Sequence, residues 1–124
     1  MEFKIDENSP IPIYEQIMNG IIQATAYGDY DEEGKLPSVR ELAVFLKVNP
    51  NTVSRAYYEL IQKDIIFVKR GIGNYINKNA KKQCMELIRN MVRENISREI
   101  DSLKRAGFSQ EEIDEIIKDI RREK

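Results

Sequence analysis

Two helix starts that follow each other closely constrain the fold of this chain more than any other feature of its sequence. The first is a Ser-Val-Arg-Glu capping box, in which the Ser38 hydroxyl can accept the N–H of Glu41 while the Glu41 carboxylate reaches back to the N–H of Ser38. The second is Asn49, a favourable N-cap, followed by Pro50 at the first helical position, where no N–H is needed. The first helix must therefore end near Lys47 and meet the next helix across a tight turn.

Helical periodicity divides the second helix, residues 49–63, into two faces. Its apolar side is made of Val53, Ala56, Tyr57 and Leu60. Its outer side is made of Asn51, Thr52, Ser54, Arg55, Tyr58 and Gln62. Short polar side chains near a helix N-terminus can read base edges in the major groove, and Arg55 can offer a fork to guanine or phosphate. The helix pair is therefore predicted to be a DNA-binding helix-turn-helix.

The first helix of this pair is short, and it needs a buried face of its own to pack on its partner. We predict that this face consists of Leu42, Ala43, Phe45 and Leu46. Its first turn leaves Arg40 exposed, where a helix that crosses the DNA backbone can use a positive charge.

A β-hairpin is predicted after helix 49–63, where β-branched and aromatic residues precede two closely spaced glycines and a second apolar pair. Gly71 and Gly73 allow the chain to turn, while Lys69 and Arg70 place two positive charges beside the tip. A strand follows the glycines, which disfavours a phosphate-binding nucleotide loop, because such loops lead into a helix. Residues 69–74 are therefore predicted to form a wing.

Upstream of these elements, apolar side chains at three- and four-residue spacing predict a helix over about 12–26. Its stripe consists of Tyr14, Ile17, Met18, Ile21 and Ile22. The first 78 residues are thus predicted to be a winged helix-turn-helix, mostly α with a small β-hairpin.

Charge is segregated along the chain although the total is only −1. Residues 1–35 carry two bases and eight acids, whereas residues 36–82 carry nine bases and three acids. Residues 83–124 are nearly balanced, with nine bases and ten acids. The segment that contains the predicted helix-turn-helix and wing is therefore the one whose net charge of +6 suits a polyanion.

The last part of the chain, residues 79–124, is predicted to be a helical hairpin. An apolar stripe runs along a helix over about 80–105, and a second capping box at Ser109 begins another helix after Gly107. Two amphipathic helices alone bury too little surface to be stable, so they must pack on the N-terminal domain or on a second copy. We expect a second copy, with a dimer interface made of Leu87, Ile88, Met91, Val92, Ile96, Ile100, Leu103, Ile113, Ile116, Ile117 and Ile120.

Several other function classes are disfavoured. The chain has no histidine and one cysteine, so it lacks the commonest general base and any multi-cysteine zinc site; we expect no enzyme, cofactor or metal. No apolar run is long enough to span a bilayer and the tail's polar face is not uniformly basic, which predicts a cytoplasmic protein without a membrane partner. Cys84 could be a redox switch, but on an apolar stripe it is expected to be a small buried side chain.

Three stretches of the sequence resemble the DNA-binding domain of the GntR family: LPSVRELA at 36–43, VNPNTV at 48–53 and RGIG at 70–73. The short tail resembles the YtrA subfamily, in which about two C-terminal helices mainly serve dimerisation. Two positions depart from the family pattern, because glycine often stands where this chain has Lys47 and Asp64; both positions favour a left-handed cap.

The resemblance implies a homodimeric repressor that binds a palindromic operator, often near its own operon and beside transporter genes. Two recognition helices about one DNA turn apart, roughly 34 Å, would read the two half-sites. From the resemblance and the helix faces, the expected DNA contacts are Ser38, Arg40, Asn49, Asn51, Thr52, Ser54, Arg55, Tyr58, Lys69, Arg70, Gly71 and Gly73. A small-molecule effector stays open, and the alternative function is a winged helix that binds proteins instead of DNA.

Overall fold

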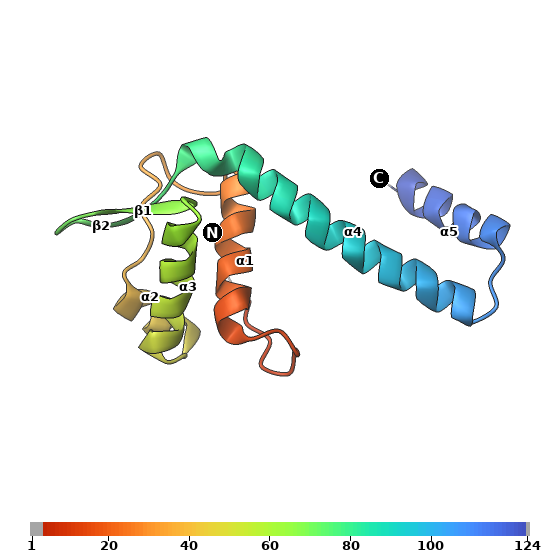
Figure 1. Ribbon diagram of the computed structural model, residues 1–124, viewed down its shortest axis with the longest axis horizontal. Coiled ribbons are helices and arrows are strands. Elements are labelled where there is room, and N and C mark those ends of the chain that lie inside the picture. Colours follow the sequence, from red (N-terminus) through yellow and green to blue (C-terminus); the bar gives the residue numbers. More distant parts are fainter. Residues whose placement is uncertain (1–3, 124) are drawn as a thin grey trace. The chain divides into compact units, whose positions relative to one another are not determined.

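The computed structural model describes residues 4–123, which form a mostly helical fold with one β-hairpin (Figure 1). This is the predicted fold class. The elements are α1 Ile13–Tyr27, α2 Val39–Leu46, α3 Pro50–Gln62, β1 Ile66–Lys69, β2 Gly73–Ile76, the 3₁₀ helix η1 Lys78–Ala80, α4 Lys81–Arg105 and α5 Gln110–Arg122. Over residues 4–123, no helix is long and apolar enough to cross a membrane.

Both predicted helix starts are confirmed. At α2, the Ser38 N–H donates to Glu41 Oε1 at 2.9 Å and the Glu41 N–H donates to Ser38 Oγ at 3.1 Å, so both bonds of the capping box are present. At α3, Asn49 Oδ1 accepts the N–H of Asn51 at 2.8 Å, and Pro50 is the first helical residue. These local bonds determine where the two short helices begin, and therefore where the turn between them lies.

The two family glycine positions adopt the backbone conformation for which glycine is preferred. Lys47 caps the C-terminus of α2 with φ of 59° and ψ of 46°, and Asp64, after α3, also has φ of 59°. A residue with a Cβ atom is strained in this left-handed region. The chain therefore forms both turns without glycine, at a cost in stability.

Replacing Lys47 by glycine is expected to stabilise the chain by up to about 1 kcal/mol, because glycine adopts this conformation without a Cβ clash. Thermal unfolding followed by circular dichroism would measure the change. Lys63→Gly is the matched control: Lys63 caps α3 with φ of −91°, where glycine relieves no strain and adds freedom to the unfolded chain. Equal losses of stability in both variants would contradict the strain assigned to Lys47.

The core of the N-terminal part lies between α1, α3, the hairpin and the start of α4. α1 and α3 run side by side in the same direction (Figure 1), and their facing side chains are buried. The largest fully buried side chains are Ile17, Ile21, Thr25, Leu42, Val53, Leu60, Ile65, Ile66, Ile76 and Cys84. Thr25 fits this apolar surrounding because its hydroxyl donates to the Ile21 carbonyl at 2.8 Å.

The prediction that Phe45 is buried is wrong, since 74% of the residue is exposed. Leu42 and Ala43 make the contact of α2 with the rest of the domain and are buried, while Leu46 is half-buried. With about 100° between successive residues, Phe45 falls outside the arc that these three share. It lines an open cavity of about 540 Å³, together with Tyr30, Asp31, Lys35, Pro37, Glu41 and Leu42.

The chain divides into two compact units, and the first of them ends at Ile88. This unit extends past residue 78, because the first turns of α4 pack on the N-terminal core: Cys84 is fully buried, and Leu87 and Ile88 are half-buried against it. The start of α4 is therefore part of the core of the first unit.

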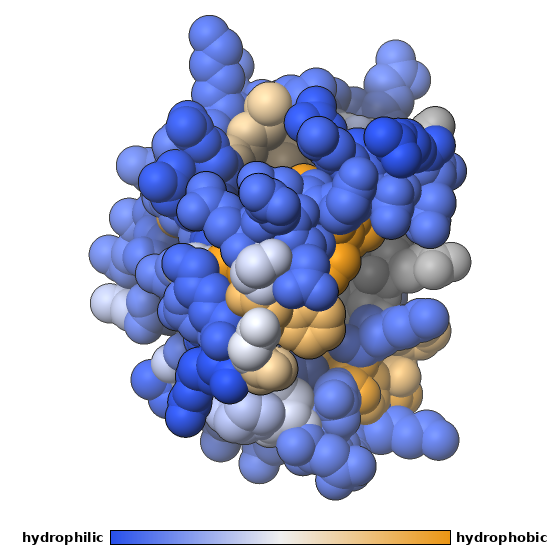
Figure 2. Space-filling model, turned by 90° about the vertical axis from the view of Figure 1, so that its right-hand side faces the viewer, coloured by the Kyte–Doolittle hydropathy of each residue, from blue (hydrophilic) through white to orange (hydrophobic). Residues whose placement is uncertain are grey.

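The second unit begins at Arg89 and contains the remainder of α4 and all of α5. Gly107, with φ of 97°, lies just after the end of α4, and Ser109 is the N-cap of α5, with both bonds of a capping box to Glu112, as predicted. Ile113 is buried. Much of the apolar stripe is uncovered, and Figure 2 shows hydrophobic side chains gathered among hydrophilic ones on the side of the molecule that it faces. The large side chains exposed here are Val92, Ile96, Phe108, Ile117 and Ile120.

Candidate nucleic-acid interface

The outer face of α3 is exposed as predicted, and its inner face is buried. Val53, Ala56, Tyr57 and Leu60 are all at most 3% exposed. Asn51, Ser54, Arg55 and Tyr58 are exposed, and Thr52 is half-buried. Because the polar side chains begin at the N-terminus of α3 and continue for two turns, they are placed where a recognition helix carries its base-reading groups.

The N-terminus of α2 offers a hydrogen-bond donor and a cation. Ser38 is exposed; its oxygen accepts the Glu41 N–H, and its one hydroxyl proton can donate either to the Glu41 carboxylate or to a phosphate. Arg40 is exposed in the same first turn. The hydrogen bonds from the N–H and hydroxyl of Ser38 lower the pKa of Glu41, so this carboxylate stays charged and holds the cap.

A buried tyrosine joins α3 to the start of α2. The Tyr57 hydroxyl donates to the Pro37 carbonyl at 2.7 Å across 20 positions of sequence. Burial, and secondarily the charge of Glu41, raises the pKa of this hydroxyl well above its usual value, so Tyr57 stays protonated and remains a donor. The bond fixes Pro37, the residue before Ser38, relative to α3, which helps to hold α2 and α3 in one arrangement.

Arg55 has a partner that the sequence did not indicate. Its guanidinium carbon lies 3.8 Å from the centroid of the Tyr14 ring, a cation–π contact between α3 and the first turn of α1. Tyr14 was predicted as a member of the α1 core stripe, and it is half-buried. Because the periodicity of each helix is read separately, neither pattern shows that these two side chains meet.

The wing has the predicted hairpin form. β1 and β2 pair antiparallel with Lys69 opposite Gly73, and the Ile72 N–H donates to the Lys69 carbonyl at 2.9 Å across the turn. Gly71 has φ of 74° in the third position of this turn, where such a φ favours glycine. A Cβ atom on Gly71 would meet nothing within 4 Å, so the tip is open to a partner. Arg70 beside it is exposed.

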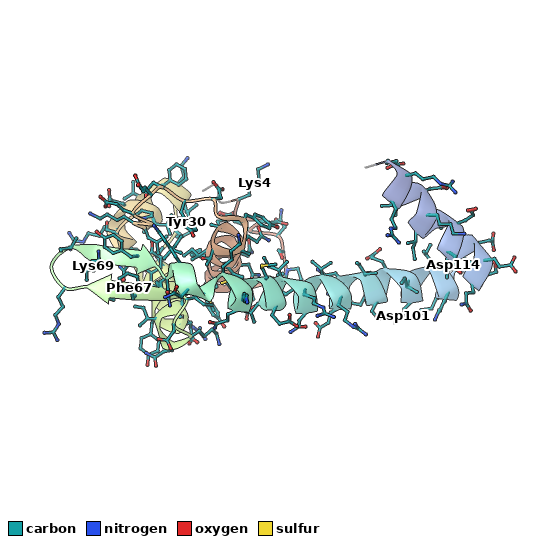
Figure 3. The ribbon with its side chains drawn as sticks, turned by 90° about the horizontal axis from the view of Figure 1, so that it is seen from above. Lys4, Tyr30, Phe67, Lys69, Asp101 and Asp114 are labelled. Carbon is teal, nitrogen blue, oxygen red and sulfur yellow. The ribbon has the colours of Figure 1, made fainter. Side chains whose placement is uncertain are left out.

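Aromatic side chains stiffen the wing behind its tip. The rings of Phe67 and Tyr75 stack at 5.8 Å between centroids, and Lys69 Nζ lies 4.3 Å from the centroid of Tyr75. Figure 3 shows Lys69 and Phe67 on the projecting hairpin. The Lys69 charge is thus held along the strand, whereas Arg70 is exposed in the turn.

Lys35 is a cation that sequence analysis assigned to the acidic N-terminal segment, but the fold places it at the wing. It forms an isolated antiparallel bridge with Tyr75, supported by the Leu36 N–H to Asn74 carbonyl bond at 2.9 Å. The Lys35 Cε lies 3.3 Å from where a Cβ of Gly73 would stand, so the absence of a side chain at Gly73 leaves room for the close approach of Lys35. The sequence places a lysine just before Leu36-Pro37, but no pattern in the neighbouring residues indicates that this lysine pairs with β2.

The cysteine lies away from these surfaces. Burial raises the pKa of the Cys84 thiol, although a hydrogen bond with Thr25 acts in the opposite direction. A protonated, buried thiol is a poor nucleophile. Among residues 4–123, no cluster of three or more His, Cys, Asp or Glu side chains could hold a metal ion.

Comparison with known families gives the same assignment as the motifs. The family of bacterial regulatory proteins called gntR matches residues 13–76, which run from the start of α1 to the end of β2. The chain is 43% identical over 117 residues to the HTH-type transcriptional repressor YtrA of Bacillus subtilis strain 168, and the match covers 94% of this chain and 90% of that protein.

Solved structures with a similar fold include two GntR-family regulators. The GntR family transcriptional regulator from Listeria monocytogenes is 36% identical with a TM-score of 0.73, and the match covers 93% of this chain and 98% of that one. YtrA from Sulfolobus acidocaldarius, a GntR-family transcription factor, is 41% identical with a TM-score of 0.56, and the match covers 80% of this chain and 97% of that one.

The matched family region contains every predicted DNA contact, from Ser38 to Gly73. The members of this family are transcription regulators and not enzymes. The chain therefore belongs to the GntR family of bacterial regulatory proteins, with a YtrA-like composition of winged helix-turn-helix and short helical tail, and it is a DNA-binding transcription regulator.

Proposed function

We propose that this regulator is a homodimeric repressor that binds a palindromic operator. α3 enters the major groove, and the wing, residues 69–74, lies on the adjacent groove or backbone. The observation that carries the proposal is the exposed polar face of α3, flanked by exposed cations on α2 and on the wing tip. The similarity to the repressor YtrA supports repression of target genes, and we place the protein in the cytoplasm, where its DNA lies.

The proposed contacts fall into three groups. Phosphates and nearby bases are bound by Ser38, Arg40 and Asn49; base edges by Asn51, Thr52, Ser54, Arg55 and Tyr58; and the flank of the site by Lys69, Arg70, Gly71 and Gly73. Asn49 Oδ1 is already engaged as the α3 cap, so Asn49 contributes its amide N–H₂ group. Lys35 joins the third group because of its place beside Gly73.

A dimer accounts for the uncovered apolar stripe of the tail. Ile96 is 52% exposed and Ile120 is 55% exposed, and such side chains at helical spacing suit burial against another copy. The proposed interface comprises Leu87, Ile88, Met91, Val92, Ile96, Ile100, Leu103, Ile113, Ile116, Ile117 and Ile120. Of these, Leu87 and Ile88 also pack on the N-terminal core, and Ile113 is already buried within the single chain. A two-fold dimer presents two copies of α3, which matches the symmetry of a palindrome.

Selection of bound fragments from random DNA tests this function. A palindromic consensus is the expected result, with binding that weakens steeply as salt increases, because each neutralised phosphate releases counterions. Searching the genome for this consensus then tests whether the protein's own operon, and transporter genes beside it, are its targets. A protein that ignores DNA even at low salt would instead be a protein-interaction module.

Arg55→Ala is expected to weaken operator binding by about 1–3 kcal/mol and to leave dimerisation unchanged. If Arg55 contacts a phosphate, the salt slope also falls by about one. Fluorescence anisotropy on the selected operator measures affinity, and sedimentation measures the dimer. Arg105→Ala is the matched control, because it removes the same charge from an exposed position at the end of α4, outside the proposed interface with DNA. Equal effects of both variants would remove Arg55 from the contact list.

A further inference from the structure

Tyr14 lies outside the helix-turn-helix and the wing, yet its ring contacts the recognition helix. The Arg55 guanidinium carbon is 3.8 Å from the ring centroid, close enough for the flat guanidinium to lie on the face of the ring. In that position the ring covers the guanidinium face, while the N–H donors, which lie in its plane, remain available to DNA. The contact therefore restricts the side chain without using its hydrogen bonds.

We propose that Tyr14 is a positioning residue for DNA recognition, because its ring holds Arg55 in place before DNA arrives. This inference rests on the proposed contact between Arg55 and the operator. An exposed arginine has a long, flexible side chain that must lose rotamer freedom to present its donors as a fork. Contact with the ring face, whose electrons attract the cation, removes part of that freedom in the unbound protein.

A purely structural role of Tyr14 is the competing explanation, because the residue also packs against the core. Its hydroxyl does not anchor the residue to a distant element: it donates to Glu15, the next residue, at 3.3 Å. The ring face is therefore the group to test, and two variants separate it from packing. Tyr14→Phe keeps the ring and loses the hydroxyl, whereas Tyr14→Leu keeps an apolar side chain and loses the ring.

The experiment measures operator affinity of the full chain by fluorescence anisotropy at fixed salt, for both Tyr14 variants alone and with Arg55→Ala. Tyr14→Phe is expected to bind within twofold of the wild type, and Tyr14→Leu about two- to fivefold more weakly, the range of an exposed cation–π contact. When Arg55 is already alanine, Tyr14→Leu should have no further effect on affinity. This coupling is the readout that a merely structural role would not produce.

Each other outcome overturns the proposal in a recognisable way. Should Arg55→Ala bind as the wild type does, the proposed Arg55 contact fails together with the positioning role. In two other cases Arg55→Ala weakens binding but only the positioning role fails. In the first, Tyr14→Leu has no effect on affinity. In the second, Tyr14→Leu weakens binding equally in the wild-type and Arg55→Ala backgrounds. Thermal unfolding of each variant identifies losses of affinity that come from unfolding.

A measurement on the unbound wild type keeps the test independent of the folding of Tyr14→Leu. NMR relaxation of arginine Nε–H groups reports their order on the picosecond-to-nanosecond timescale. The Arg55 Nε–H is expected to be more ordered than that of Arg40, which is also exposed and lies on α2. Equal order of the two side chains would overturn the proposal.

Discussion

Ile96→Glu is expected to abolish the dimer and to weaken binding to the full operator by about a hundredfold or more. Ile96 is 52% exposed on the apolar stripe of α4, so a glutamate there remains hydrated in the monomer. In the proposed dimer the same carboxylate would be buried against a partner, at a large desolvation cost. A monomer can bind only one half-site at a time, and it loses the effective concentration that links the two sites.

Sedimentation and operator titration together test this prediction, with Ser97→Glu as the matched control. Ser97 is exposed and lies one residue later, roughly 100° around the helix from Ile96. Ser97→Glu therefore adds the same charge outside the apolar stripe. The control should remain a dimer with nearly wild-type affinity. If Ile96→Glu also sediments as a dimer and binds the operator as tightly as the wild type, the proposed role of the tail is wrong.

Leu60→Ala is expected to lower the free energy of unfolding by about 2–5 kcal/mol, because it opens a cavity in a packed core. Leu60 is fully buried and belongs to α3, whose outer face carries the proposed base contacts. The folded molecules of this variant should still prefer the same operator sequence, since the outer side chains are unchanged. Chemical denaturation measures the stability, and fragment selection at low temperature measures the preference.

Gln62→Ala is the control for this prediction. Gln62 is exposed on the same helix, so its truncation should change stability by less than about 0.5 kcal/mol. Comparable losses in the two variants would mean that Leu60 is not the core residue that its burial indicates.

The parts of the fold that depend on neighbouring residues could be predicted from the sequence. The caps at Ser38, Asn49 and Ser109 join groups only two or three residues apart, so their bonds follow from local geometry. The left-handed backbone at Lys47 and Asp64 is instead expected from the resemblance to the GntR family, in which glycine often stands at both positions. Local rules therefore located the helix pair that carries the proposed site.

The parts that depend on contacts between distant segments could not be predicted in this way. Phe45 has the spacing of a core residue within its own helix, but α2 has only one buried arc and Phe45 lies beside it. The approach of Tyr14 to Arg55 and the pairing of Lys35 with Tyr75 each join segments about 40 residues apart. Such pairs appear only when the helices and the hairpin are assembled.

The buried cysteine makes the natural chain a convenient background for chemical labelling. Cys84 is the single cysteine of the protein, it is fully buried, and its thiol is held in the unreactive protonated form. A cysteine introduced at an exposed position such as Asn51 or Arg70 would therefore react far faster than Cys84. Fluorophores or DNA cross-linkers could thus be attached at one chosen point, and the path of the operator across the protein could be mapped without removing the native residue.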